Sequence, residues 1–157
     1  MKRVLILLLL PAASLFAADS WPAVSFTTVR AYSWPEGTNG GIVQGMKLAP
    51  KVINKKGTLL NADQVHRLQV AVAHSPRKID FFECYNPHNA FVFYNAAKKP
   101  VAYLELCFSC LGNRAQPPIP PPSIPNYLSL AAIFEELKLP MGPYTTANEF
   151  RKARLEH

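Results

Sequence analysis

The sequence predicts an α+β fold in which a small antiparallel sheet is packed by two main helices. Several segments are rich in β-branched and aromatic residues and are bounded by Gly, Asn or Pro, as strands commonly are. Two other segments carry apolar residues at the spacing of a helix. The loop between two of the strand-like segments has hairpin length, which favours antiparallel pairing.

The strand-like segments are expected, in order, at 24–32, 42–48, 79–83, 90–94 and 101–108. Gly45 inside the second of these weakens that strand or marks a bulge. Residues 95–100 form the hairpin loop between the last two segments. The predicted sheet is therefore built mainly from the first third and the middle of the chain.

Alternation along 101–108 assigns the two faces of the last predicted strand. The core face carries Ala102, Leu104, Leu106 and Phe108, and the other face carries Val101, Tyr103, Glu105 and Cys107. Cys107 is therefore expected to project away from the main core. This setting is not that of an ordinary small buried hydrophobic residue.

Two helices are expected to cover the sheet. The first begins after Asn61, because Asn61 and Gln64 form a capping-box pattern, and it ends at 74–76, before a proline. The second covers 127–139 and is stopped by Pro140 and Gly142. Thr146 and Glu149 form a second capping-box pattern that opens a short basic helix at the end of the chain.

The N-terminus has the pattern of a secretory signal peptide. Two basic residues precede a continuous apolar run at 4–10 and a stretch of mostly small residues at 12–18. We expect a signal peptide over 1–17 and a single exported domain over 18–157, within which 117–125 is a proline-rich polyproline II spacer. The protein is then bacterial and periplasmic or extracellular, with no membrane span after signal removal.

The basic charge indicates what kind of partner the protein could have. The formal net charge is +7, and it falls to +5 without Lys2 and Arg3. Much of the excess lies near turns, at Lys47, Lys51, Lys55, Lys56, Arg77, Lys78, Lys98 and Lys99, with Arg151, Lys152 and Arg154 near the end. Solvated turns are the ordinary explanation, and a patch for an anionic envelope component is the functional one. Another protein is the second candidate partner, whereas the export signal argues against nucleic acid.

Three cysteines carry the candidate chemistry, and they leave three alternatives open. In the first, Cys84 forms a disulfide with Cys107 or Cys110 and one thiol stays free. In the second, Cys84, His88, Cys107 and Cys110 form a closed structural zinc site. In the third, Cys107 and Cys110 are a redox pair, although no helix N-terminus follows to lower a thiol pKa.

The block from Cys84 to Leu139 resembles a group of exported bacterial proteins that have no assigned activity. Those proteins join a Cys-x-x-Pro segment to a hairpin that ends in Cys-Phe-x-Cys, and here Cys84, Cys107 and Cys110 match residue for residue. The resemblance implies no substrate. No catalytic motif is found, so the sequence predicts a non-catalytic binding or accessory protein with a structural cysteine cluster. The alternative is a thiol–disulfide redox or soft-metal-handling protein that uses Cys107 and Cys110.

Overall fold

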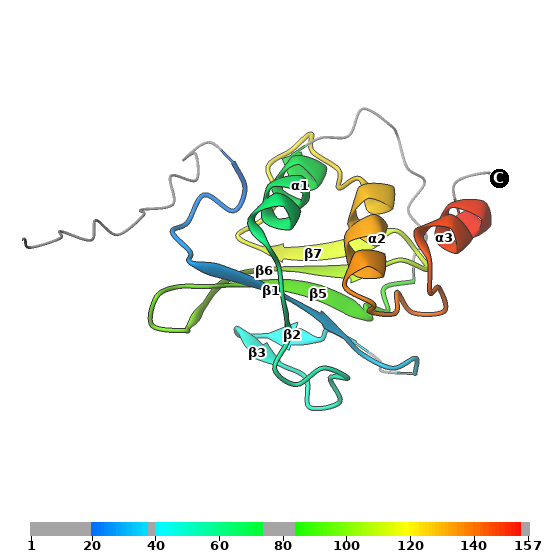
Figure 1. Cartoon of the computed structure of the whole chain (residues 1–157), viewed down its shortest axis with the longest axis horizontal. Helices are drawn as coiled ribbons and strands as arrows, with labels where there is room; N and C mark the ends of the chain where they lie inside the picture. The colour runs from blue at the N-terminus through cyan, green and yellow to red at the C-terminus, as the bar shows by residue number, and fades with distance from the viewer. Residues whose placement is uncertain (1–19, 38–39, 74–83, 155–157) are drawn as a thin grey trace, which may run out of the picture.

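The computed structural model describes residues 20–37, 40–73 and 84–154. Within them a five-stranded antiparallel sheet, ordered β4-β1-β5-β6-β7, carries three helices on one face and a two-stranded hairpin below the other (Figure 1). The strands are β1 (Thr28–Ser33), β2 (Val43–Gln44), β3 (Lys47–Leu48), β4 (Thr58–Leu59), β5 (Asn89–Tyr94), β6 (Pro100–Cys107) and β7 (Gly112–Gln116). The helices are α1 (Ala62–Ala73), α2 (Tyr127–Glu136) and α3 (Ala147–Arg154). The predicted α+β class is confirmed.

The start of α1 is fixed by the predicted capping box. The backbone N–H of Gln64 donates to Asn61 Oδ1 at 2.8 Å, and the backbone N–H of Asn61 donates to Gln64 Oε1 at 3.0 Å. The two side chains thus satisfy amides that the first helical turn leaves without a partner. The predicted end of this helix at 74–76 lies outside the described residues.

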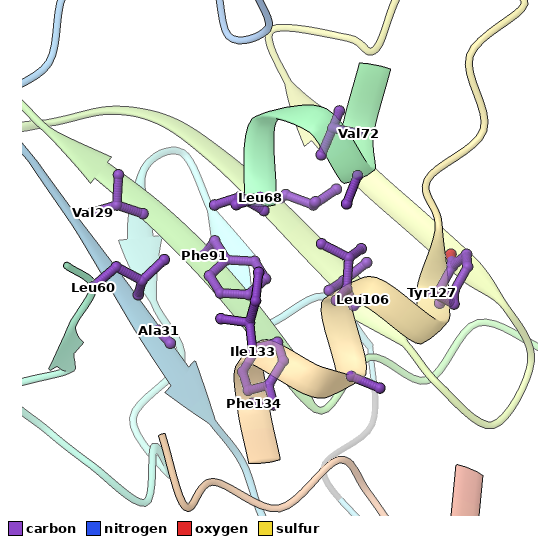
Figure 2. Packing of buried hydrophobic residues seen from close by; sticks show 14 of the residues in the cluster. Val29, Ala31, Leu60, Leu68, Val72, Phe91, Leu106, Tyr127, Ile133 and Phe134 are labelled. Atoms are coloured by element: carbon purple, nitrogen blue, oxygen red, sulfur yellow. The ribbon is translucent and has the colours of Figure 1, made fainter. Parts of the chain in front are cut away.

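The main core lies between the sheet and the helices (Figure 2). The predicted core face of β6 is confirmed, because Ala102, Leu104, Leu106 and Phe108 all belong to this cluster. Phe91 of the central strand β5 packs against Phe134 of α2, with ring centroids 4.6 Å apart. The apolar faces of α1 and α2 therefore pack against the sheet, as the spacing of their apolar residues predicts.

A second, smaller cluster lies on the opposite face of the sheet. Its buried residues are Tyr32, Trp34, Ile42, Val43, Ala90 and Val92. The prediction of a single strand over 42–48 is wrong. This segment forms the hairpin β2–β3, in which Val43 lies opposite Leu48. Gly45 and Met46 both have positive φ at the turn, which reverses the chain between two short strands.

Helices α2 and α3 are close to the prediction. Helix α2 is capped by Asn126, whose Oδ1 accepts the N–H of Ser129, and it ends at Glu136, three residues earlier than expected. Helix α3 is capped by Thr146, whose Oγ1 accepts the N–H of Glu149 at 3.1 Å. Phe150 of α3 is fully buried, and through this side chain the helix packs on the main core.

Some parts of the sheet and its connections differ from the prediction. The strands β4 and β7 were not expected, and β1 begins four residues later than the predicted segment 24–32. The proline-rich segment is not a continuous extended spacer, because the N–H of Ser123 donates to the oxygen of Pro120 across a turn. The strand expected over 79–83 lies outside the described residues. Among the residues described, no helix has the length and apolarity that a membrane crossing needs.

Candidate functional site

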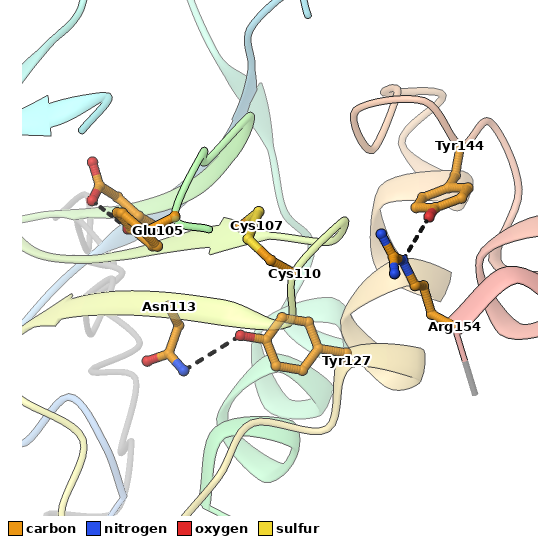
Figure 3. Close-up of a disulfide and its surroundings, with 8 residues drawn as sticks. Glu105, Cys107, Cys110, Asn113, Tyr127, Tyr144 and Arg154 are labelled. Atoms are coloured by element: carbon orange, nitrogen blue, oxygen red, sulfur yellow. Dashed lines mark hydrogen bonds between the residues drawn. A yellow bond between two sulfur atoms is a disulfide. The ribbon is translucent and has the colours of Figure 1, made fainter. Parts of the chain in front are cut away.

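The cysteine pair lies in the tight connection between β6 and β7. Cys107 is the last residue of β6, and the structure places it in a disulfide with Cys110, with a Cα–Cα distance of 5.7 Å (Figure 3). Cys84 is exposed and free. The bond differs from the alternative in which Cys84 pairs with Cys107 or Cys110: it closes a four-residue turn and does not tie two distant segments together.

Both bonded cysteines are fully buried. Cys107 lies on the strand face opposite the main core, as its alternation predicts, but this face is also covered. The ring of Tyr85 lies over Gly112, where an added Cβ would stand 3.0 Å from the ring and 4.0 Å from Cys107 Cβ. Burial of both sulfur-bearing residues is the setting of a structural bond, because an attacking thiolate needs access to sulfur.

The segment after the disulfide is a strand. Gly112 to Gln116 pair with β6, so the Cys-x-x-Cys motif is not followed directly by a helix. The turn itself is held by Phe108, whose ring makes edge-to-face contacts with Tyr127, Phe134 and Phe150. Phe108, the residue after Cys107, thus packs the Cys-x-x-Cys turn against the helices.

Replacing both bonded cysteines by alanine is expected to lower the free energy of unfolding by about 2 kcal/mol, because the closed loop is short and constrains the unfolded chain only modestly. Urea denaturation of Cys107→Ala/Cys110→Ala, compared with wild type with and without dithiothreitol, checks this value. Cys84→Ala is the matched control, since the exposed thiol should change stability by less than about 0.5 kcal/mol. An equal loss in the control would contradict a structural role specific to the pair.

A buried carboxylate lies two residues before Cys107 on the same strand face. Glu105 is fully buried, and its carboxylate accepts the backbone N–H of Val43 and, at 2.8 Å, the hydroxyl of Tyr85. Arg114, opposite Glu105 on β7, lies 3.9 Å away, and its guanidinium stacks over the ring of Tyr85 at 5.1 Å. Burial, followed by the negative charge of Glu105, raises the pKa of the Tyr85 hydroxyl, so the hydroxyl remains a donor at neutral pH.

The carboxylate joins three parts of the chain. It holds the β2–β3 hairpin through Val43, the segment after Cys84 through Tyr85, and the edge strand β7 through Arg114. Gly41 approaches so closely that an added Cβ would stand 2.8 Å from Arg114 Nη1. Glu105 is fully buried, and these contacts assign it to anchoring the second face of the sheet.

The zinc alternative needs Cys84, His88, Cys107 and Cys110 together. The structure joins Cys107 and Cys110 to each other, and within the described ranges no group of three or more His, Cys, Asp or Glu side chains is placed to hold a metal ion. His88 is 5% exposed, and its Nε2 has no hydrogen-bond partner among the described residues. Its imidazole lies beside Gly142, where Ser109 Oγ also approaches.

His88 gives the fold a pH dependence of known sign. Burial lowers the pKa of its imidazole below 6.5, against smaller upward effects of Glu36 and of a hydrogen bond to the Asn86 backbone. The unfolded chain therefore takes up a proton at a pH where the folded chain does not. The free energy of unfolding is expected to fall as pH drops below about 6.5, and to level off below the folded pKa.

Urea denaturation between neutral and mildly acidic pH checks this expectation. His88→Gln should remove this part of the slope whatever its own effect on stability, while the exposed His66→Gln should keep it. Equal slopes in wild type and His88→Gln would show that His88 is not the group that titrates.

A shallow groove of about 400 Å³ lies between α1 and α2. It is lined by His66, Arg67, Val70, Ala71, Asn126, Ser129 and Ala132. Arg67 at the edge of the groove donates to Asp63 at 2.8 Å and to Glu136 at 2.6 Å. These two carboxylates balance its positive charge. The groove holds no pair of groups suited to acid–base chemistry.

Comparisons with known proteins add no family: no protein-family model, no curated protein and no solved structure matches this chain. The sequence analysis placed Glu105 on the outer face of the last predicted strand but did not predict its contacts with Tyr85, Val43 and Arg114. The signal was present in the alternation of β6, which places a carboxylate on a face that also carries Tyr103.

Proposed function

We propose that this chain is an exported, non-catalytic binding domain that recognises an anionic component of the cell envelope, and that its Cys107–Cys110 bond is structural. The N-terminal sequence pattern supports export. The burial of Cys107, Cys110 and Glu105 argues against catalysis at these groups, because a substrate has no access to them.

The observation that carries the binding proposal is the uneven distribution of acidic residues between the helices and the chain that includes the β2–β3 hairpin. Of the acidic residues in the described ranges, Asp63, Glu135, Glu136 and Glu149 lie on the helices or their first turns, Glu105 is buried, and Glu36 stands in a loop. The chain from Gly37 to Ala62 contains four lysines and no Asp or Glu. A surface with one sign of charge attracts ligands of the opposite sign and raises their association rate.

Binding to a soluble polyanion tests this proposal. Fluorescence anisotropy with labelled dextran sulfate should show binding at low salt that weakens strongly at high salt, because exposed charges are screened. Neutral dextran of the same size is the control polymer. Equal affinity for both polymers, or no binding at low salt, would contradict an anionic partner.

A second candidate is thiol–disulfide exchange, favoured by the bond between Cys107 and Cys110. A dithiol partner would reduce that bond to two thiols and would itself be oxidised to a disulfide. Alkylation of the folded protein with iodoacetamide after mild glutathione treatment separates the two functions. One modified thiol, Cys84, supports a structural bond, whereas rapid modification of Cys107 or Cys110 supports exchange.

A further inference from the structure

Two exposed aliphatic side chains stand among lysines next to the edge of the sheet. Ile53 and Leu59 are each 52% exposed, and the segment that carries them also carries the exposed Lys51, Lys55 and Lys56. In Figure 1 this segment follows β3 and lies below the sheet, on the side opposite the three helices. The exposed apolar residues outside it, Val24 and Val70, belong to other parts of the described chain.

The backbone of this segment is held firmly against β1. The N–H of Ile53 donates to the oxygen of Ser33 at 2.8 Å, and Asn54 Nδ2 donates to the oxygen of Ala31 at 2.9 Å. Arg30 donates to the backbone oxygens of Lys56 and Gly57, each at 2.9 Å. The exposure of the two aliphatic side chains is therefore imposed by the fold and is not the result of a loosely attached loop.

The bend that presents the lysines is equally constrained. Gly57 has a φ of +66°, and a Cβ there would stand 2.5 Å from the ring of Tyr32. Its N–H donates to the oxygen of Asn54 at 2.7 Å and closes the turn that carries Lys55 and Lys56. Within the described part of the chain, Lys47, Lys51, Lys55 and Lys56 form no ion pair. All four lysines are exposed, so their charge is directed to solvent.

We propose that the basic–apolar edge, defined as residues 51–59 with Lys47, docks on the surface of an anionic lipid bilayer. Aliphatic side chains surrounded by lysines gain from leaving water at the boundary of the acyl chains, while the lysines meet the anionic head groups. A polyanionic glycan offers Ile53 and Leu59 only the small C–H faces of its sugar rings. This inference rests on the proposed function, because it names a lipid surface as the anionic partner.

Co-sedimentation with vesicles tests the inference. The full chain is mixed with sucrose-loaded vesicles of phosphatidylglycerol and phosphatidylcholine in equal parts, and with vesicles of phosphatidylcholine alone. Lys55→Gln/Lys56→Gln should weaken binding to the anionic vesicles about 25-fold, on the basis of the contribution of each lysine near such a surface. The control Lys99→Gln/Lys152→Gln removes the same charge elsewhere and should change binding by less than about threefold.

A second pair of variants tests the contribution of the two aliphatic side chains to vesicle binding. Ile53→Thr/Leu59→Thr should weaken binding to anionic vesicles about 20-fold, from the apolar area that stays in water. Val24→Thr/Val70→Thr is the matched control, because these aliphatic residues are also exposed but lie outside the edge. All variants carry the same N-terminus, so the apolar run at 4–10 contributes equally to each. Thermal melts confirm that each variant is folded.

The outcomes separate the lipid inference from the proposed function. Loss of vesicle binding in both edge variants but in neither control supports the lipid surface. Binding to dextran sulfate without preference for anionic vesicles, or equal losses in the edge variants and their controls, overturns the lipid inference and leaves an anionic partner in place. No binding to either anionic probe overturns both.

Discussion

Replacing Glu105 by alanine is expected to lower the free energy of unfolding by about 3–5 kcal/mol, mainly because two buried donors are left without an acceptor. The Val43 N–H and the Tyr85 hydroxyl would lose their acceptor. A buried donor without an acceptor costs about 1–3 kcal/mol. Arg114 adds less, because its side chain is 53% exposed and solvent screens its charge. Urea denaturation measures the loss directly.

Two further variants show whether burial is the cause. Glu105→Gln keeps the side-chain volume and one acceptor oxygen, so it should cost less than Glu105→Ala. Glu136→Gln removes a carboxylate from a half-exposed ion pair with Arg67 and should cost less than about 1 kcal/mol. If Glu105→Ala were no more costly than Glu136→Gln, the anchoring role of the buried carboxylate would be wrong.

Local signals predicted the helices and the faces of the sheet. The capping box at Asn61 and Gln64 needs only residues three apart, and the structure confirms both of its hydrogen bonds. The alternation along 101–108 assigns the core face without knowledge of the partner strands, because successive side chains in a strand point to opposite faces. Val101 is the exception, since it was expected on the other face and packs against the main cluster. These features were accessible because their cause lies within one short segment.

Features that depend on distant partners were missed. β4 is two residues long and exists because Leu59 and Thr58 pair with Arg30 and Ala31, far away in sequence. β7 is polar, and its strand conformation follows from pairing with β6. The hairpin β2–β3 was mistaken for one strand because Met46 adopts a positive φ that its residue type does not suggest.

The sequence predicted which residues belong to the candidate site but not how they are bonded to one another. Cys107 and Glu105 were correctly assigned to one face of a strand, but which sulfur bonds which depends on the turn that brings Cys110 back toward Cys107. Leu111 has a φ of 54° at this turn, an unusual conformation for a branched side chain. The positive φ thus falls on Leu111, one residue before Gly112.

Phe134→Ala is expected to lower the free energy of unfolding by about 3–5 kcal/mol, from lost transfer free energy and the cavity left behind. Phe134 is fully buried on α2, and its ring lies 4.6 Å from Phe91 and 5.8 Å from Phe108. Phe91 belongs to the central strand and Phe108 to the disulfide turn. The substitution therefore loosens the contact between the helical layer and both of these elements.

Leu128→Ala is the matched control for Phe134→Ala, because Leu128 lies on the same helix but is only half-buried. It should cost less than half as much, and Phe134→Leu should fall between the two because it fills part of the cavity. Coupling to the turn is measured by combining Phe134→Ala with Cys107→Ala/Cys110→Ala. Since Phe108 links the two sites, the combined loss should differ from the sum of the separate losses by at least about 0.5 kcal/mol. Strict additivity would show that the disulfide turn and the helical layer are energetically independent.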